Sequence, residues 1–123
     1  MSVNEGAVTV VLQVFSGRPD PSWALDPEEL GAVTERVGAA RQSKSSEEPP
    51  PPVLGYRGFR VENRAGVEEL PEALSVWRGV IVASDPSRGV ETWADVAGLE
   101  GWLLEDARRR GHGELLAAAG VRD

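Results

Sequence analysis

The stretch Val8 to Leu30, with the sequence VTVVLQVFSGRPDPSWALDPEEL, decides how the rest of the chain is read. Apolar side chains occupy every second position at its start, namely Val8, Val10, Leu12 and Val14. The positions between them hold a mixture of polar and apolar residues. This alternation predicts a β-strand with one face in the core.

A helix with a strong start signal follows the strand. Asp26 is in the N-cap position, Pro27 suits the first helical turn, and Glu29 completes a capping box. Leu25 and Leu30 occupy the two hydrophobic-staple positions. We expect the helix to span residues 27–41 and to bury one apolar stripe, which consists of Leu30, Val33, Val37 and Ala40.

The second half of the chain predicts two further strands. Residues 54–62 alternate in two registers that change at Gly58, which is typical of a strand with a bulge. Residues 70–73 are compatible with one helical turn. Residues 76–83 are rich in β-branched side chains and predict a single strand, followed by loop residues at 84–89.

Two helices are expected near the end of the chain. The first should begin after Asp95, its N-cap, and end near Arg110, with Gly111 in the C′ position. Its apolar stripe consists of Val96, Leu99, Trp102, Leu103 and Ala107. A short terminal helix should cover residues 114–119.

These elements predict an α+β domain that spans residues 1–123. We expect a small, mostly antiparallel sheet of about three strands, with the two main helices packed on one of its faces. Residues 43–53 are rich in Ser, Glu and Pro, and they predict a flexible linker between two halves of this single domain.

Composition excludes several classes of function. The net charge of −7 argues against nucleic acid and membrane surfaces as partners. Arg57, Arg60 and Arg64 form a local basic group, which we interpret as a solvated strand edge. The chain has no cysteine, and this fits a cytoplasmic protein. Arginine greatly outnumbers lysine, a bias typical of GC-rich bacterial genomes.

The order of four segments resembles a group of small uncharacterised bacterial proteins. The segments are SGRPDPSW (16–23), LGYRGF (54–59), a short valine-rich strand and LEGWLL (99–104). The resemblance covers most of the chain outside the linker. It implies one recurring domain, and it implies no activity, cofactor or functional residue.

The sequence offers no catalytic or metal-binding motif. The single histidine, His112, lies between two glycines, where nothing local orients its ring as a catalytic base requires. One histidine and no cysteine cannot form the usual zinc sites. We therefore expect no metal and no cofactor.

The loop at residues 16–23 is the main candidate binding site. Arg18 could hold a carboxylate or phosphate, and Trp23 could form an apolar wall. The structural alternative pairs Asp20 with Arg18 or the loop backbone, and places Trp23 over the core. Tyr56 and Arg57 are further candidates. Trp77, Trp93 and Tyr56 could together form a partner-binding patch. Taken singly, each of them is better explained by packing in the core.

Two functions of different classes remain open at this point. The first is a non-catalytic accessory or protein-interaction domain that acts through a protein partner or self-association. The alternative is a small-molecule or anion-binding protein, conceivably an enzyme, with its site at Arg18, Asp20 and Trp23. A flat apolar patch would favour the first function, and a deep pocket at the loop would favour the second.

Overall fold

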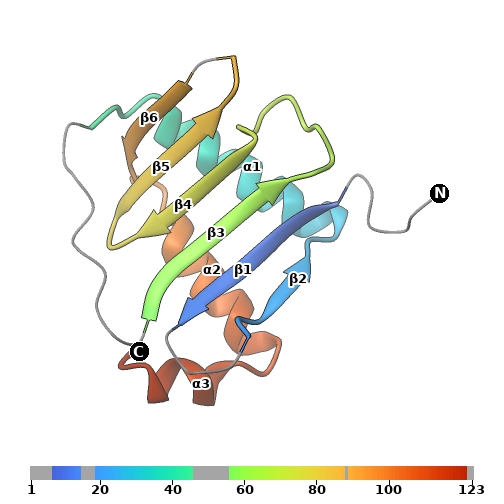
Figure 1. The fold of residues 1–123 in the computed structure, drawn as a ribbon, viewed down its shortest axis with the longest axis vertical. Coiled ribbons are helices and arrows are strands. Elements are labelled where there is room, and N and C mark those ends of the chain that lie inside the picture. The colour runs from blue at the N-terminus through green and yellow to red at the C-terminus, as the bar shows by residue number, and fades with distance from the viewer. Residues whose placement is uncertain (1–6, 15–18, 46–55, 88, 122–123) are drawn as a thin grey trace.

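The computed structural model describes residues 7–14, 19–45, 56–87 and 89–121. It is an α+β fold with one six-stranded antiparallel sheet in the order β2-β1-β3-β4-β5-β6. Figure 1 shows the sheet in front of two long helices. The elements are β1 (Val8–Val14), β2 (Ser22–Ala24), α1 (Pro27–Arg41), β3 (Tyr56–Asn63), β4 (Ala73–Trp77), β5 (Val80–Asp85), β6 (Gly89–Ala94), α2 (Leu99–Arg109) and α3 (Gly113–Ala118).

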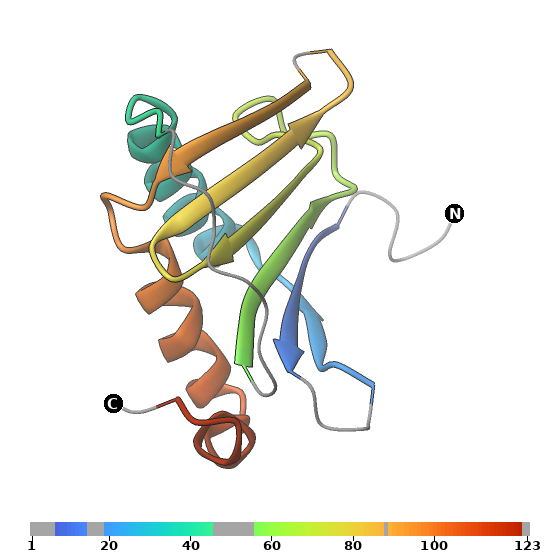
Figure 2. The ribbon, with the colours of Figure 1, turned by 60° about the vertical axis from the view of Figure 1, so that its left-hand side comes forward.

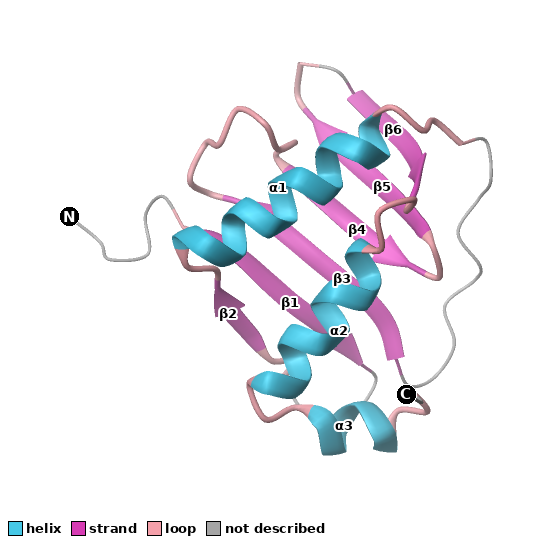
Figure 3. Ribbon diagram, turned by 180° about the vertical axis from the view of Figure 1, so that it is seen from behind, coloured by secondary structure: helices cyan, strands magenta, loops and turns pink. Residues whose placement is uncertain are grey.

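Strand β1 confirms the predicted alternation. Its four alternate apolar residues are buried, and the three residues between them are only half-buried. β1 lies inside the sheet, between β2 and β3. Its buried face packs against the helices, so the core lies between the sheet and α1 and α2. Figure 3 shows both helices on this one face, and Figure 2 shows the layers from the side.

Helix α1 begins and ends where the sequence predicts. The Asp26 carboxylate accepts from the Glu29 amide at 2.8 Å, and the Asp26 amide donates to the Glu29 carboxylate at 3.0 Å. This is the predicted capping box. Val33, Val37 and Ala40 are fully buried, and Leu30 is partly buried against the core.

Helix α2 begins at Leu99, later than predicted. The chain turns at residues 96–97, and Val96 is 60% exposed, so Val96 is not part of the apolar stripe. Asp95 nevertheless caps the helix, because its carboxylate accepts from the amides of Leu99 at 2.7 Å and Glu100 at 2.8 Å. Gly111 has a φ of +93° directly after the C-cap, as its predicted C′ position requires.

The prediction of about three strands is wrong, because the sheet has six. The valine-rich stretch 76–83 is divided between β4 and β5 by a two-residue turn. Arg78 and Gly79 occupy this turn with φ of +48° and +82°, as in a type I′ hairpin turn. Residues 70–73 make no helical turn, and β4 already begins at Ala73.

The two edge strands were also absent from the prediction. β2 has only three residues, which is too short for alternation to identify, and it lies within the predicted loop. β6 covers Gly89, which was predicted to lie in a loop, and the residues between that loop and the predicted start of the second main helix. Trp93 is 1% exposed in β6, and Trp77 in β4 is 8% exposed, so both tryptophans pack in the fold.

Strand β3 confirms the predicted bulge. Leu12 and Val14 of β1 pair with Phe59 and Tyr56, so β3 has one extra residue between its two pairs. Gly58 lies in this bulge with a φ of +87°. The backbone of β4 approaches it so closely that a Cβ atom there would overlap the carbonyl oxygen of Val76.

The first residues of the predicted linker are part of the sheet. The Ala94 amide donates to the Ser43 carbonyl at 2.8 Å, and the Ser45 amide donates to the Thr92 carbonyl at 2.9 Å. Lys44 therefore forms a bridge with Trp93 on the outer edge of β6. The rest of the predicted linker, residues 46–53, lies outside the described residues.

Candidate functional site

The described part of the 16–23 loop is held to the rest of the fold by hydrogen bonds. Arg18 lies outside the described residues. The Asp20 carboxylate accepts from the amide of Val14 at 3.1 Å, which closes the connection between β1 and β2. This bond is one form of the structural alternative, in which Asp20 pairs with the loop backbone.

Trp23 connects β2 to the end of α2. Its indole N–H donates to the Asp106 carboxylate at 3.0 Å. Its ring stacks on His112, with ring centres 5.4 Å apart and planes inclined by 20°. The guanidinium carbon of Arg110 lies 5.3 Å from the centre of the same ring. The indole therefore binds groups of its own chain.

Asp106 is 1% exposed and is the centre of a charged cluster. It accepts from Trp23, from Arg109 at 3.1 Å and from Arg110 at 3.1 Å. Arg110 also donates to both carboxylate oxygens of Glu29 at 2.7 Å, which connects α2 to the first turn of α1. Burial opposes the charged form of Arg110, but its bonds to Asp106 and Glu29 raise its pKa above the usual value.

Tyr56 is bonded to the opposite end of α2. Its hydroxyl donates to the Glu100 carboxylate at 2.5 Å, and the other oxygen of Glu100 accepts from the Gly79 amide at 3.0 Å. Burial and this hydrogen bond raise the pKa of Tyr56 above its usual value. The Tyr56 ring also contacts Trp77, with centres 5.5 Å apart.

The structure does not join the predicted site residues into one site. Trp23 donates to Asp106, and Tyr56 donates to Glu100. Asp106 and Glu100 are six positions apart on α2, which corresponds to about 9 Å along the helix axis. Arg57 lies half-buried next to the bulge of β3. Whether any of these side chains binds a ligand remains a prediction.

The sheet has a second face, which we call the outer face and which points away from α1 and α2. Two rows of paired residues cross all six strands on it. The first row is Ala24, Thr9, Glu62, Ala73, Ser84 and Val90, and the second is Ser22, Val11, Arg60, Ser75, Val82 and Thr92. Only β3 places long charged side chains in these rows, namely Arg60 and Glu62. Together with Arg64, which directly follows β3, they form a ridge between smaller neighbours.

A hollow lies on each side of this ridge. One has a volume of about 400 Å³ and is lined by residues of β3, β4 and β5 and the loops between them, including Arg60, Glu72 and Ser84. The other has a volume of about 370 Å³ and is lined from β1 and β2, including Thr9 and Val11. The two hollows share Glu62 and Arg64 as a common wall.

The ridge itself alternates in charge. Arg64 donates to Glu62 at 3.2 Å, and Arg60 lies 3.9 Å from the other oxygen of the same carboxylate. Arg60 and Arg64 are exposed to solvent, as expected, but their expected position at a strand edge is wrong, because β3 is interior to the sheet. The sequence signal for this face is the mixed set of positions in β1, which strand pairing places beside Glu62 and Arg60.

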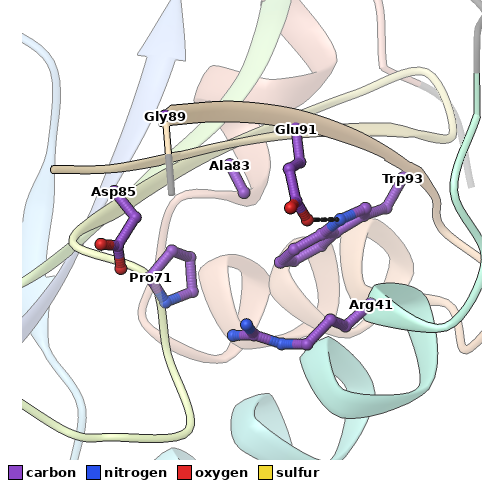
Figure 4. A pocket seen from close by; sticks show the side chains of 7 residues that line it. All are labelled: Arg41, Pro71, Ala83, Asp85, Gly89, Glu91 and Trp93. Carbon is purple, nitrogen blue, oxygen red and sulfur yellow. Dashed lines mark hydrogen bonds between the residues drawn. The ribbon is translucent and has the colours of Figure 1, made fainter. Parts of the chain in front are cut away.

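A smaller space lies between the end of α1 and the hairpin of β5 and β6 (Figure 4). Arg41 lies over the Trp93 ring at 5.1 Å, and the Trp93 indole donates to Glu91 at 3.0 Å. The space holds about 10 Å³, which is at the lower limit of what one water molecule needs. It is therefore a packing gap.

The described residues contain no group of three or more acidic or histidine side chains that could hold a metal ion. In the same part of the chain, no helix is both long and apolar enough to cross a membrane. Comparisons with family models, curated proteins and solved structures gave no match for this chain.

Proposed function

We propose that this chain is a non-catalytic protein-interaction domain that binds a protein partner through the outer face of its sheet. The observation that carries the proposal is the pair of hollows on either side of the β3 ridge. Helices cover the opposite face of the sheet, whereas the described residues place no helix over this one (Figures 1 and 3). A protein partner can be complementary in shape to this ridge and its two hollows.

The charges of the outer face favour a protein over a nucleic acid. Arg60 and Arg64 alternate with Glu62, and Glu72 lies on the far wall of the larger hollow. A phosphate backbone requires an excess of cations, which this balanced set does not provide. A protein surface that carries both signs of charge is the complementary partner.

The hydrogen bonds that the carboxylates of the polar clusters accept from their own chain support a non-catalytic role. Asp106 and Glu100 are occupied within the fold, because each accepts from two or more donors of its own chain. The alternative anion site at residues 16–23 has less support, because Asp20 and Trp23 already have partners inside the fold.

The proposal can be tested by photo-cross-linking, which does not depend on lysine, in the native host followed by quantitative mass spectrometry. Arg64→Glu reverses a charge on the ridge, where the side chain is 66% exposed. Lys44→Glu makes the same change of charge at an exposed position on the edge of β6 and serves as the matched control.

We expect a protein that is captured by the wild type and by Lys44→Glu, but about tenfold less by Arg64→Glu, which corresponds to a loss of about 1.4 kcal/mol. Its cross-links should map to β1 to β5. Equal capture by both variants, or cross-links confined to α1 and α2, would contradict the proposal.

A further inference from the structure

The seam between α1 and α2 contains two arginine side chains next to one indole ring. Arg36 of α1 and Arg109 of α2 each place the guanidinium carbon 5.9 Å from the ring centre of Trp102. Figure 3 shows the two helices side by side on the same face of the sheet, opposite to the outer face. Trp102 was expected in the core, but it is only partly buried.

Arg36 differs from its neighbours because it lacks a carboxylate. Arg108, Arg109 and Arg110 each pair with an acidic residue within 4 Å. Within the described chain, Arg36 donates only to the carbonyl of Ala32 at 3.0 Å, and its buried Nε has no acceptor. A half-buried guanidinium in this situation has lost hydration without a full replacement.

The indole N–H of Trp102 also lacks an acceptor. Trp23 and Trp93 donate theirs to Asp106 and Glu91. Trp102 makes no such bond to any described residue, and its nitrogen is not among the buried unpaired atoms, so it is open to solvent. The buried Nε of Arg36 is out of reach, but its Nη2 group makes no hydrogen bond to a described residue and is not buried. The seam therefore presents this Nη2 group and the Trp102 N–H to a partner.

We infer that this seam binds a carboxylate, supplied by an acidic side chain of a protein segment. The carboxylate accepts from Arg36 and from the Trp102 indole, while Arg109, 61% exposed, adds positive charge at the rim. Arg36 is the one unpaired cation here, and Arg109 is shared with Asp106, so a single negative charge fits better than a doubly charged phosphate. Tryptophan and arginine are also the residues most enriched at the energetic centres of protein interfaces.

The test is an NMR titration of the full chain with a capped hexaglutamate peptide. We expect a saturable shift of the Trp102 indole signal and of the Arg36 guanidinium signal. Arg36→Gln should weaken binding about tenfold, as expected for a lost charge-assisted hydrogen bond. The matched control is Arg64→Gln, which removes the same charge from the outer face and should bind within about twofold of the wild type.

Two further variants keep the inference falsifiable if Arg36→Gln folds poorly. Arg36→Lys keeps the charge without the planar fork, and Trp102→Phe keeps the ring without its N–H, so each should weaken binding several-fold. The inference is overturned if the peptide gives no saturable shift at Trp102, if Arg36→Gln binds like the wild type, or if inorganic phosphate binds more tightly than hexaglutamate. These results are independent of the outer face, so the proposed function stands or falls separately.

Discussion

Trp23 and Asp106 are 83 positions apart in the chain, and a 3.0 Å hydrogen bond joins them. The bond connects the shortest strand of the sheet to the second long helix. Asp106 is itself buried and accepts from Trp23, Arg109 and Arg110, so it orients one side chain of β2 and two at the end of α2. The loop that looked most like a binding site thus contributes to the stability of the fold.

Removal of the Asp106 carboxylate should therefore destabilise the domain strongly. Asp106→Ala leaves the Trp23 indole and the Nε of Arg110 without their acceptor, while Arg110 keeps its ion pair with Glu29. We expect a loss of about 1–3 kcal/mol in the free energy of unfolding. Trp23→Phe removes one donor of three and should cost less. Urea unfolding of both variants measures the difference. A loss below about 0.5 kcal/mol for Asp106→Ala would contradict this role.

The bulge of β3 depends on a glycine. Gly58→Ala forces a Cβ against the Val76 carbonyl and requires a positive φ that alanine disfavours. We expect destabilisation by more than about 2 kcal/mol, or a loss of folding. Thermal melting combined with circular dichroism tests this, and a variant that melts within one degree or so of the wild type would refute the geometry.

Helix α1 offers the opposite test. Gly31 is exposed in α1, and a Cβ there would meet open space. Gly31→Ala should stabilise the domain by about 0.5–1 kcal/mol, because alanine loses less backbone entropy in a helix. Chemical denaturation gives the sign directly. A loss of stability would mean that something outside the described chain requires the glycine.

The N-cap of α1 is a third stability test. Asp26→Ala removes one side of the capping box, and we expect a cost of about 0.5–2 kcal/mol. Asp26→Asn keeps an acceptor at the same position and should recover most of the loss. Equal unfolding curves for Asp26→Ala and the wild type would show that the cap contributes nothing.

The sequence predicted those features that depend on local chemistry. The alternation of β1, the capping box at Asp26, the bulge at Gly58 and the C′ position of Gly111 follow from residues a few positions apart. The hairpin turn at Arg78 was missed because a non-glycine residue holds the positive φ, where asparagine or aspartate would have been the usual signal.

The candidate sites depend on contacts that no local pattern contains. The outer face becomes visible only when the register places Thr9 beside Glu62 and Glu62 beside Ala73. The seam likewise depends on Arg36 and Trp102, which different helices bring together. Strand pairing and helix packing bring together residues that are far apart in the chain. The spacing of residues along a single sequence does not show these contacts.

The alkaline limit of stability should depend on Tyr56, the single tyrosine of the chain. Burial and the bond to Glu100 raise its pKa in the folded state, whereas the unfolded chain titrates near the usual value of about 10. The stabilising effect is complete below pH 10 or so and is lost as the pH rises, because the unfolded chain then releases a proton that the folded chain keeps. The free energy of unfolding should fall by about 1.4 kcal/mol per pH unit from this group.

Urea unfolding at a series of alkaline pH values measures this slope. Tyr56→Phe removes the titrating group but keeps the ring contacts with Trp77 and Phe59, so its stability should fall less steeply with pH. Ultraviolet absorbance of the tyrosinate gives an independent measurement, since the chain has no other tyrosine to contribute. If Tyr56 ionises near its usual pKa while the domain is still folded, or if the two slopes are the same, the buried bond between Tyr56 and Glu100 does not control alkaline stability.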